Sequence, residues 1–142
     1  MGDDMVIHLQ APFKQIGSSS SFQQIESSSS CEKCGYNKRD HCNGGIIKTC
    51  LDCFLDHHPL LFYKYGVSNA EFRRSRRGTC SVYDSKPTHE VIKIATDFLE
   101  KKRDFGPYNI IKNNCENFAV YCKTGMALGT QVLGFVERCR IM

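Results

Sequence analysis

Four cysteines arranged as two Cys-x-x-Cys pairs constrain the fold of this chain more than any other feature. Cys31 and Cys34 form the first pair, Cys50 and Cys53 form the second, and fifteen residues lie between them. A tight turn within each pair can direct both sulfurs to the same side, and two such pairs supply the four thiolates of a tetrahedral zinc site. We therefore expect the two pairs to meet and to hold a structural zinc ion.

Other uses of the cysteine-rich middle stay open at this stage. Cys42 and His41, or His57 and His58, could replace one of the four ligands. The segment could also be a loosely ordered insertion whose cysteines never meet. Thiol–disulfide chemistry is disfavoured, because neither pair is predicted to open a helix after a strand, as a thioredoxin-like site requires.

The chain as a whole has the length and composition of one globular domain. It has 142 residues, of which 41% are hydrophobic and 24% charged. Nine cysteines behind an acidic start without a secretory signal favour reduced thiols and an intracellular, cytoplasmic location. A serine-rich linker is expected at residues 17–30 and the cysteine-rich insertion at residues 31–58. No organic cofactor is expected.

The net charge of +4 is concentrated in one short run of the sequence. Arg73, Arg74, Arg76 and Arg77 fall within five residues. No aromatic residues alternate with them as they would in a nucleic-acid platform, so nucleic-acid binding is not expected. The run is interpreted as a solvated or phosphate-facing basic loop.

Alternation and β-branched residues predict short extended segments. Residues 5–9 are expected to form a strand in which His8 shares a face with Val6, opposite Ile7 and Leu9. Further extended segments are predicted, and they lie at residues 60–65, 78–83 and 108–111.

Two helices are predicted in the second half of the chain. The first has apolar residues at helical spacing between Val91 and Leu99, with Ser85 or Thr88 as its cap and basic residues 101–103 at its end. The second begins after Asn113 or Asn114, runs to about Lys123 and stops at Gly125. The apolar tail 126–136 is shorter than the ~20 residues of a membrane span and is interpreted as packed or membrane-touching.

Cys115 lies at the predicted start of the second helix. The helix dipole and the free N–H groups of the first turn favour ionisation of a thiol there, although the charge of Glu116 partly opposes it. Cys115 is therefore a candidate nucleophile. Alternatively, it is a buried cysteine that packs with Phe118 and Cys122 on the inner face of the helix.

Two short motifs resemble those of a known family. The run 114–118, Asn-Cys-Glu-Asn-Phe, is similar to the Asn-Cys-Glu-His-Phe box of the lecithin:retinol acyltransferase-like (LRAT, or NC) domain in its plant-type form. The run 2–9, Gly-Asp-Asp-Met-Val-Ile-His-Leu, is similar to that family's Gly-Asp-x-x-Val-[Ile/Val]-His-[Leu/Phe] segment. The two matches bracket the chain and cover nearly all of it apart from the cysteine-rich middle.

The resemblance implies a fold and a chemistry. The fold would be a single α+β domain over residues 1–142, of the papain-like or LRAT type, with an antiparallel sheet packed on helices. The chemistry would be acyl transfer or phospholipid hydrolysis through an acyl-cysteine intermediate. By resemblance, Cys115 is the nucleophile and His8 matches the family's second histidine, which polarises and orients the first. A phospholipid or acyl-lipid substrate and peripheral membrane contact are implied.

The chain departs from the family pattern at its start. The family's general-base histidine lies in a segment His-x-Gly-Ile-Tyr-Val-Gly-Asp, whereas this chain begins at Met1. We expect a domain that lacks its first strand and has impaired catalysis, with His8 as an auxiliary or makeshift base. Asn117 stands where many animal relatives have a histidine, but that position is not the family's base. The alternative is a non-catalytic binding module with a zinc-stapled loop.

Overall fold

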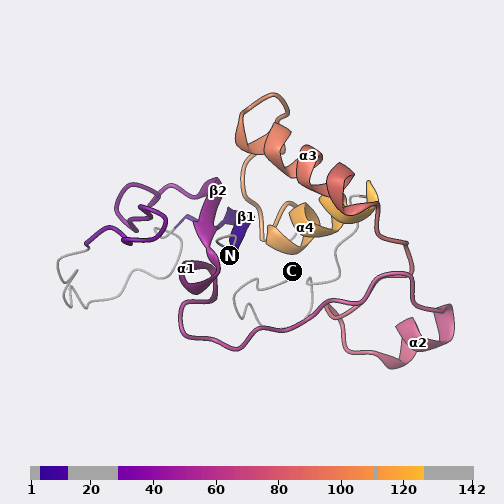
Figure 1. Cartoon of the computed structure of the whole chain (residues 1–142). Helices are drawn as coiled ribbons and strands as arrows, with labels where there is room; N and C mark the ends of the chain where they lie inside the picture. The colour runs from indigo at the N-terminus through magenta and orange to yellow at the C-terminus, as the bar shows by residue number, and fades with distance from the viewer. Residues whose placement is uncertain (1–3, 13–28, 111, 127–142) are drawn as a thin grey trace.

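The chain folds into a mixed arrangement of helices around a small antiparallel sheet (Figure 1). The computed structural model describes residues 4–12, 29–110 and 112–126. Two strands form the sheet, β1 (Met5–Gln10) and β2 (Gly45–Cys50). The helices in chain order are α1 (Leu51–Leu55), α2 (Asn69–Arg74), α3 (Thr88–Leu99) and α4 (Cys115–Thr124). These features agree with the predicted α+β class.

The strand predicted at residues 5–9 is confirmed as β1, but its partner was not predicted. β1 pairs with β2 so that Met5 faces Cys50 and Gln10 faces Gly45. β2 lies inside the cysteine-rich segment, where its β-branched residues Ile46, Ile47 and Thr49 suit a pleated surface. Gly44 permits the start of β2 to approach the chain beyond β1. Its φ is 73°, and a Cβ there would lie 2.5 Å from the Gln10 oxygen.

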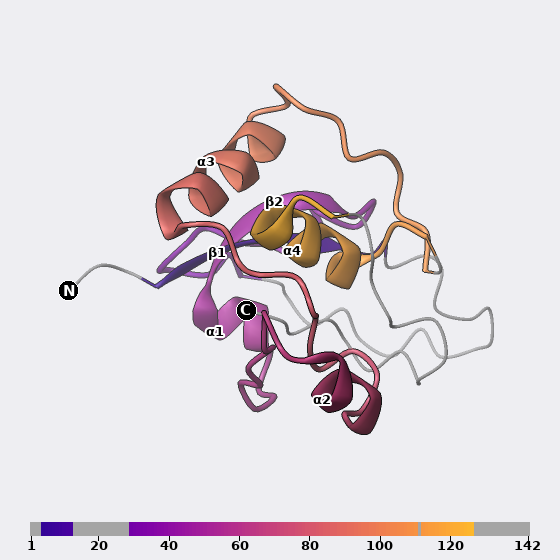
Figure 2. The ribbon, with the colours of Figure 1, turned by 90° about the vertical axis from the view of Figure 1, so that its right-hand side faces the viewer.

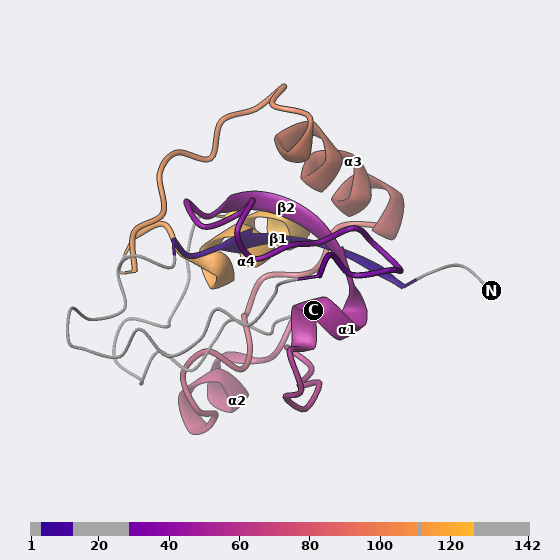
Figure 3. The same ribbon diagram turned by 90° about the vertical axis from the view of Figure 1, so that its left-hand side faces the viewer.

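The core lies between the sheet and the two longer helices. The opposite views in Figures 2 and 3 show α4 on one side of the strands, with α3 beside it. Leu9 of β1 packs there with Phe98 of α3 and Phe118 of α4, and all three are buried. Burying one such side chain contributes roughly 1.5–3 kcal/mol. One face of β1 is thus fixed against the helices.

The two predicted helices are confirmed, with one difference at their ends. α4 begins after Asn114 and ends at Gly125, which adopts the left-handed conformation at φ 77°. α3 is preceded by Pro87 and has no side-chain cap, so the prediction of Ser85 or Thr88 as the cap was wrong. Pro87 itself occupies the N-cap position, and its side chain has no oxygen that could cap the helix. The basic residues 101–103 follow the end of α3.

The strands predicted at residues 60–65 and 78–83 were wrong. Only an isolated parallel bridge joins them, between Lys64 and Cys80, supported by the Ser81 N–H donating to the Lys64 oxygen at 2.8 Å. An isolated pair of short segments is not a ladder, and β propensity depends on having a partner over several residues. The short helices α1 and α2 were not predicted, because five or six residues carry little periodicity.

Of residues 108–111, predicted to be extended, residue 111 lies outside the described residues, and residues 108–110 belong to a turn. Asn109 and Asn113 exchange two backbone hydrogen bonds of 2.9 Å across it. The predicted linker at residues 17–30, apart from residues 29 and 30, and the predicted tail beyond residue 126 lie outside the described residues. Within the described part of the chain, each helix is too short or too polar to span a bilayer.

Candidate functional site

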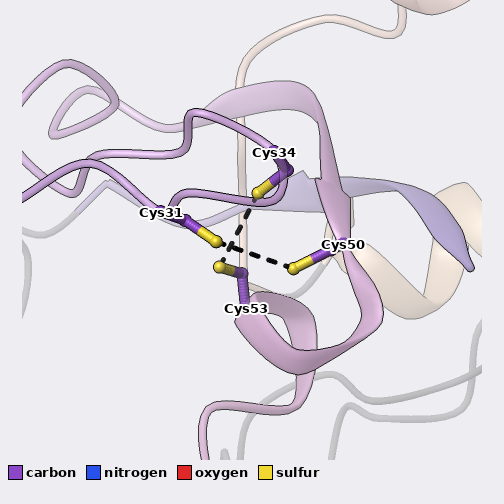
Figure 4. Close-up of side chains that lie close together, drawn as sticks. All are labelled: Cys31, Cys34, Cys50 and Cys53. Carbon is purple, nitrogen blue, oxygen red and sulfur yellow. Dashed lines mark hydrogen bonds between the residues drawn. The ribbon is translucent and has the colours of Figure 1, made fainter. Parts of the chain in front are cut away.

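The two cysteine pairs meet at the junction of β2 and α1. Cys50 is the last residue of β2, and Cys53 lies in α1 one turn later. Cys31 and Cys34 approach from a loop, and Figure 4 shows all four sulfurs directed toward one another. The Sγ atoms of Cys31 and Cys50 are 3.9 Å apart, and those of Cys34 and Cys53 are 3.7 Å apart. The meeting of the two pairs, predicted from their spacing, is confirmed.

These distances suit metal coordination better than disulfide bonding. A disulfide holds its sulfurs about 2.05 Å apart. In a tetrahedral site with Zn–S bonds of about 2.3 Å, neighbouring sulfurs lie about 3.8 Å apart. All four sulfur atoms lie within 4.8 Å of one another, so the longest sulfur–sulfur distance would need to shorten by about 1 Å in a tetrahedral site. The four cysteines could therefore hold a metal ion with small adjustments.

Local hydrogen bonding favours a thiolate within this four-sulfur cluster. The backbone N–H groups of Cys34 and Lys33 donate to the Cys31 sulfur and lower the pKa of its thiol to about 7. Burial and the neighbouring thiols raise the pKa of Cys53. Four thiols this close cannot all ionise without a compensating charge, which a bound cation would supply. Lys33 lies between Cys31 and Cys34, and Asp52 lies between Cys50 and Cys53. The two side chains form an ion pair beside the cluster.

The alternative ligands lie apart from the four-sulfur cluster. The ring of His41 stacks on Tyr36 with centroids 5.5 Å apart, and the Cys42 sulfur is 3.9 Å from the Asn43 side-chain oxygen. His58 Nδ1 lies 2.7 Å from the backbone oxygen of Asp56. The expectation that neither pair opens a helix after a strand was wrong, because Cys50 both ends β2 and precedes α1. The two pairs nevertheless face each other.

The start of α4 is fixed by a reciprocal capping box. The Asn117 backbone N–H donates to Asn114 Oδ1 at 3.0 Å, and the Asn114 N–H donates to Asn117 Oδ1 at 3.2 Å. The Asn114 side chain also donates to the Ile110 oxygen at 3.0 Å. Asn117 thus acts here as a capping residue. The box sets the position of Cys115.

Cys115 is partly buried and packs against the core cluster of Leu9, Phe98 and Phe118. Its sulfur is part of a disulfide in this structure, so nucleophilic chemistry there requires reduction. Cys122, two turns later on the same helix, is a buried free thiol whose pKa burial raises to about 12. An ionised nucleophile is therefore not expected at Cys122.

His8 lies on the face of β1 opposite Ile7 and Leu9, as alternation predicted. Its Nε2 is 3.2 Å from Thr49 Oγ1, and its ring meets that of Phe54 edge-on with centroids 5.0 Å apart. The histidine therefore bonds to its own sheet and not to the Cys115 sulfur. Burial, and secondarily the nearby His41, lower the pKa of His8 to about 4. The ring is neutral at physiological pH.

A buried polar cluster beside Cys115 was not anticipated. The Glu116 side chain is completely buried, and its charge contributes to raising the pKa of Tyr63 and Tyr65, after the larger effect of burial. The Tyr63 hydroxyl donates to the Cys80 oxygen at 2.8 Å. Glu116 therefore faces the interior, although a glutamate in a first helical turn is usually exposed. No feature of the sequence indicates this burial.

Comparisons with known proteins extend the resemblance of the two motifs. Residues 1–128 match the family described as lecithin retinol acyltransferase (LRAT). The chain is 34% identical over 134 residues to protein LEAD-SENSITIVE 1 of Arabidopsis thaliana, an alignment that covers 89% of this chain and 50% of that protein. The chain thus spans about half the length of that relative. No solved structure matches the chain.

Proposed function

Because this chain belongs to the lecithin retinol acyltransferase family, we propose that it transfers or hydrolyses acyl groups through a thioester on Cys115. The observation that carries the proposal is the position of Cys115 at the first residue of α4, directly after the cap Asn114 and inside its capping box. The helix dipole and the free N–H groups of this turn favour a thiolate once the sulfur is reduced.

The proposed reaction has two steps. The reduced Cys115 thiolate attacks the ester carbonyl of a phospholipid, and the lysophospholipid leaves as an alcohol after taking up a proton. The acyl group is then held as a thioester. An alcohol, an amine or water attacks this thioester and gives up a proton to solvent, which balances the proton taken up in the first step. The acylated product or fatty acid is released and the thiolate returns. The backbone N–H groups at the start of α4 are suited to stabilise the oxyanion of each step.

The ring of His8 lies on the face of β1 opposite the one that packs against Cys115, so we assign His8 only an indirect, auxiliary role in this reaction. Its neutral ring can accept a proton, but its low pKa makes it a weak base, and its hydrogen bond to Thr49 holds it on the sheet. Replacing Thr49 with valine would remove this bond while keeping the side-chain shape. If His8 takes part in proton transfer, the pH profile of thioester formation shifts in Thr49→Val, while that of a surface variant such as Lys48→Gln does not.

The test of the nucleophile compares two cysteines of one helix. Reduced protein is incubated with a phospholipid carrying a labelled acyl chain, and the label on the protein is measured before and after hydroxylamine. We expect a hydroxylamine-sensitive adduct that Cys115→Ala abolishes and Cys122→Ala leaves in place. A folded, reduced protein that acquires no label, or a label that survives in Cys115→Ala, would refute the proposal.

We further propose that Cys31, Cys34, Cys50 and Cys53 hold a structural zinc ion. Sulfur separations near those of a tetrahedral site support it, and four protein ligands leave no open position for catalysis. Native mass spectrometry should show one zinc per chain, which a strong chelator removes. Iron in the same ligand set would give a coloured protein and would correct the identity of the metal. A native mass equal to that of the polypeptide alone contradicts a bound metal.

A second candidate function is a non-catalytic binding module. It is favoured by the hydrogen bond of His8, which goes to Thr49 and not to Cys115. In that case the zinc-bound, reduced protein forms no acyl adduct and still binds lipid surfaces. The labelling experiment and a binding assay on the same preparation therefore separate the two functions.

A further inference from the structure

The helix α2 and the segments that flank it form an exposed edge unlike the rest of the molecule. None of the residues of α2 is buried. Arg73, Arg74, Arg76 and Arg77 are all exposed, and none makes an ion pair with another described residue. The acidic residue of α2, Glu71, is already paired with Lys64 at 3.4 Å. Four exposed cations thus fall within five consecutive residues, and no acidic group among the described residues is paired with them.

The same part of the chain exposes large apolar side chains. Leu61 is 65% exposed and Phe62 is 78% exposed, while Phe72 within α2 is 37% exposed. Single exposed apolar residues are ordinary on a protein surface, whereas neighbouring exposed ones beside a cationic cluster indicate an interaction site. We call this surface the arginine edge, and its residues are Leu61, Phe62, Phe72, Arg73, Arg74, Arg76 and Arg77.

Backbone and side-chain bonds hold the arginine edge in place. Tyr63, next to Phe62, is buried, and its hydroxyl donates to the Cys80 oxygen. The Val67 N–H donates to the Ser81 oxygen at 3.1 Å, so the chain before α2 lies against the chain after it. Figures 2 and 3 show α2 and the connection from α1 along one edge of the molecule, away from α3. Apolar and cationic groups are thus presented on that edge together.

We propose that the arginine edge docks this protein on an anionic phospholipid bilayer. Guanidinium groups pair with lipid phosphates, and the exposed leucine and phenylalanines insert at the level of the headgroups. A nucleic-acid duplex would satisfy the arginines but would offer no apolar phase for Leu61 and Phe62. The inference deepens the proposed function, on which it rests, because docking would bring a phospholipid acyl donor to the enzyme.

The test measures sedimentation with vesicles of phosphatidylcholine alone or with phosphatidylserine added. The first variant removes the four cations of the arginine edge and is Arg73→Gln/Arg74→Gln/Arg76→Gln/Arg77→Gln. A matched control, Lys38→Gln/Arg39→Gln/Lys101→Gln/Lys102→Gln, removes four exposed cations elsewhere. The formal charge falls from +4 to 0 in both. Leu61→Ser/Phe62→Ser tests insertion. All variants act on exposed side chains, and thermal unfolding verifies that each is folded.

We expect the protein to bind only the anionic vesicles, and more weakly at high salt. Each basic residue near an anionic surface strengthens binding roughly fivefold, so the arginine variant should lose on the order of 100-fold or more while the control loses little. The serine variant should also bind more weakly. Equal losses in both four-residue variants, unchanged binding of the serine variant, or tighter binding to duplex RNA or DNA than to vesicles would overturn the proposal.

The same assay in Cys115→Ala separates this inference from the proposed function. That variant should bind anionic vesicles as tightly as the unmodified chain, because the arginine edge does not include Cys115. Vesicle binding together with a failure of the unmodified chain to form a thioester would refute the catalytic proposal and leave the arginine edge standing. Thioester formation without vesicle binding would refute docking through the arginine edge and leave the catalytic proposal standing.

Discussion

Removing one sulfur of the four-sulfur cluster should unfold the loop at residues 31–44 while the core remains. The perturbation is Cys34→Ser, and its matched control is Cys42→Ser, which removes a thiol of the same loop outside the cluster. No residue in this loop is buried, so the loop has no core of its own. Its order must come from attachments to the rest of the domain.

The magnitude follows from the attachments that the structure shows. Ordering the backbone of residues 31–44 costs on the order of 14 kcal/mol at about 1 kcal/mol per residue. The Tyr36 hydroxyl donates to Gln10 at 3.0 Å, and the Gln10 side chain donates to the His41 oxygen at 3.2 Å. With the stacking of Tyr36 on His41, these contacts contribute about 3 kcal/mol. A structural zinc contributes about 10–16 kcal/mol, which is the amount still needed.

Hydrogen–deuterium exchange resolves this prediction at individual amides. The Gly35 N–H donates to the Cys31 oxygen at 2.7 Å and the Cys31 N–H to the Tyr36 oxygen at 2.9 Å, so both should be protected in the zinc-bound protein. Chelation or Cys34→Ser should bring them to the exchange rates of an unfolded chain, whereas Cys42→Ser should not. Equal protection of these amides in the chelated protein, Cys34→Ser and Cys42→Ser would refute the metal tether.

Three further predictions concern the core and the sheet. Asn114→Ala should lower the free energy of unfolding by about 2–3 kcal/mol in urea titrations, because it removes a cap and buried hydrogen bonds, and Asn114→Asp should recover part of this loss. Phe118→Ala should cost about 3–5 kcal/mol in the same assay, against a small effect for the exposed Ile92→Ala. Folding lowers the pKa of His8 from 6.5 to about 4, so between these pH values His8 is protonated in the unfolded chain and neutral in the folded one. Stability should therefore drop by about 3 kcal/mol between these values, and His8→Gln should flatten the dependence.

Features set by local chemistry could be predicted from the sequence. The cap at Asn114, the stop at Gly125 and the helical spacing in α3 act within a few residues, and all of them located helices correctly. The two-residue spacing within each cysteine pair is likewise a local feature, and it indicated that the two pairs would meet. These are the cases in which neighbouring residues determine the conformation.

Features set by distant partners could not be predicted. β2 is a strand because Gly45–Cys50 pairs with β1, which is far away in the sequence. Residues 60–65 have the composition of a strand but lack a partner over their length. The face of β1 on which His8 lies could be predicted from alternation, but the hydrogen bond of His8 depends on where β2 places Thr49. The burial of Glu116 depends on tyrosines of another segment.

The junction of β2 and α1 connects the two candidate sites. Thr49, which contacts His8 through its hydroxyl, directly precedes the cluster residue Cys50, and Phe54, which contacts the His8 ring, directly follows Cys53. Both contacts of His8 therefore come from residues adjacent to the sulfurs that a metal would hold. Because a backbone shift at a ligand moves its neighbour with it, loss of the metal should loosen His8 as well as the loop. The His8 ring resonances in the chelated protein report this directly, and a shift confined to residues 31–44 would show that the two sites are independent.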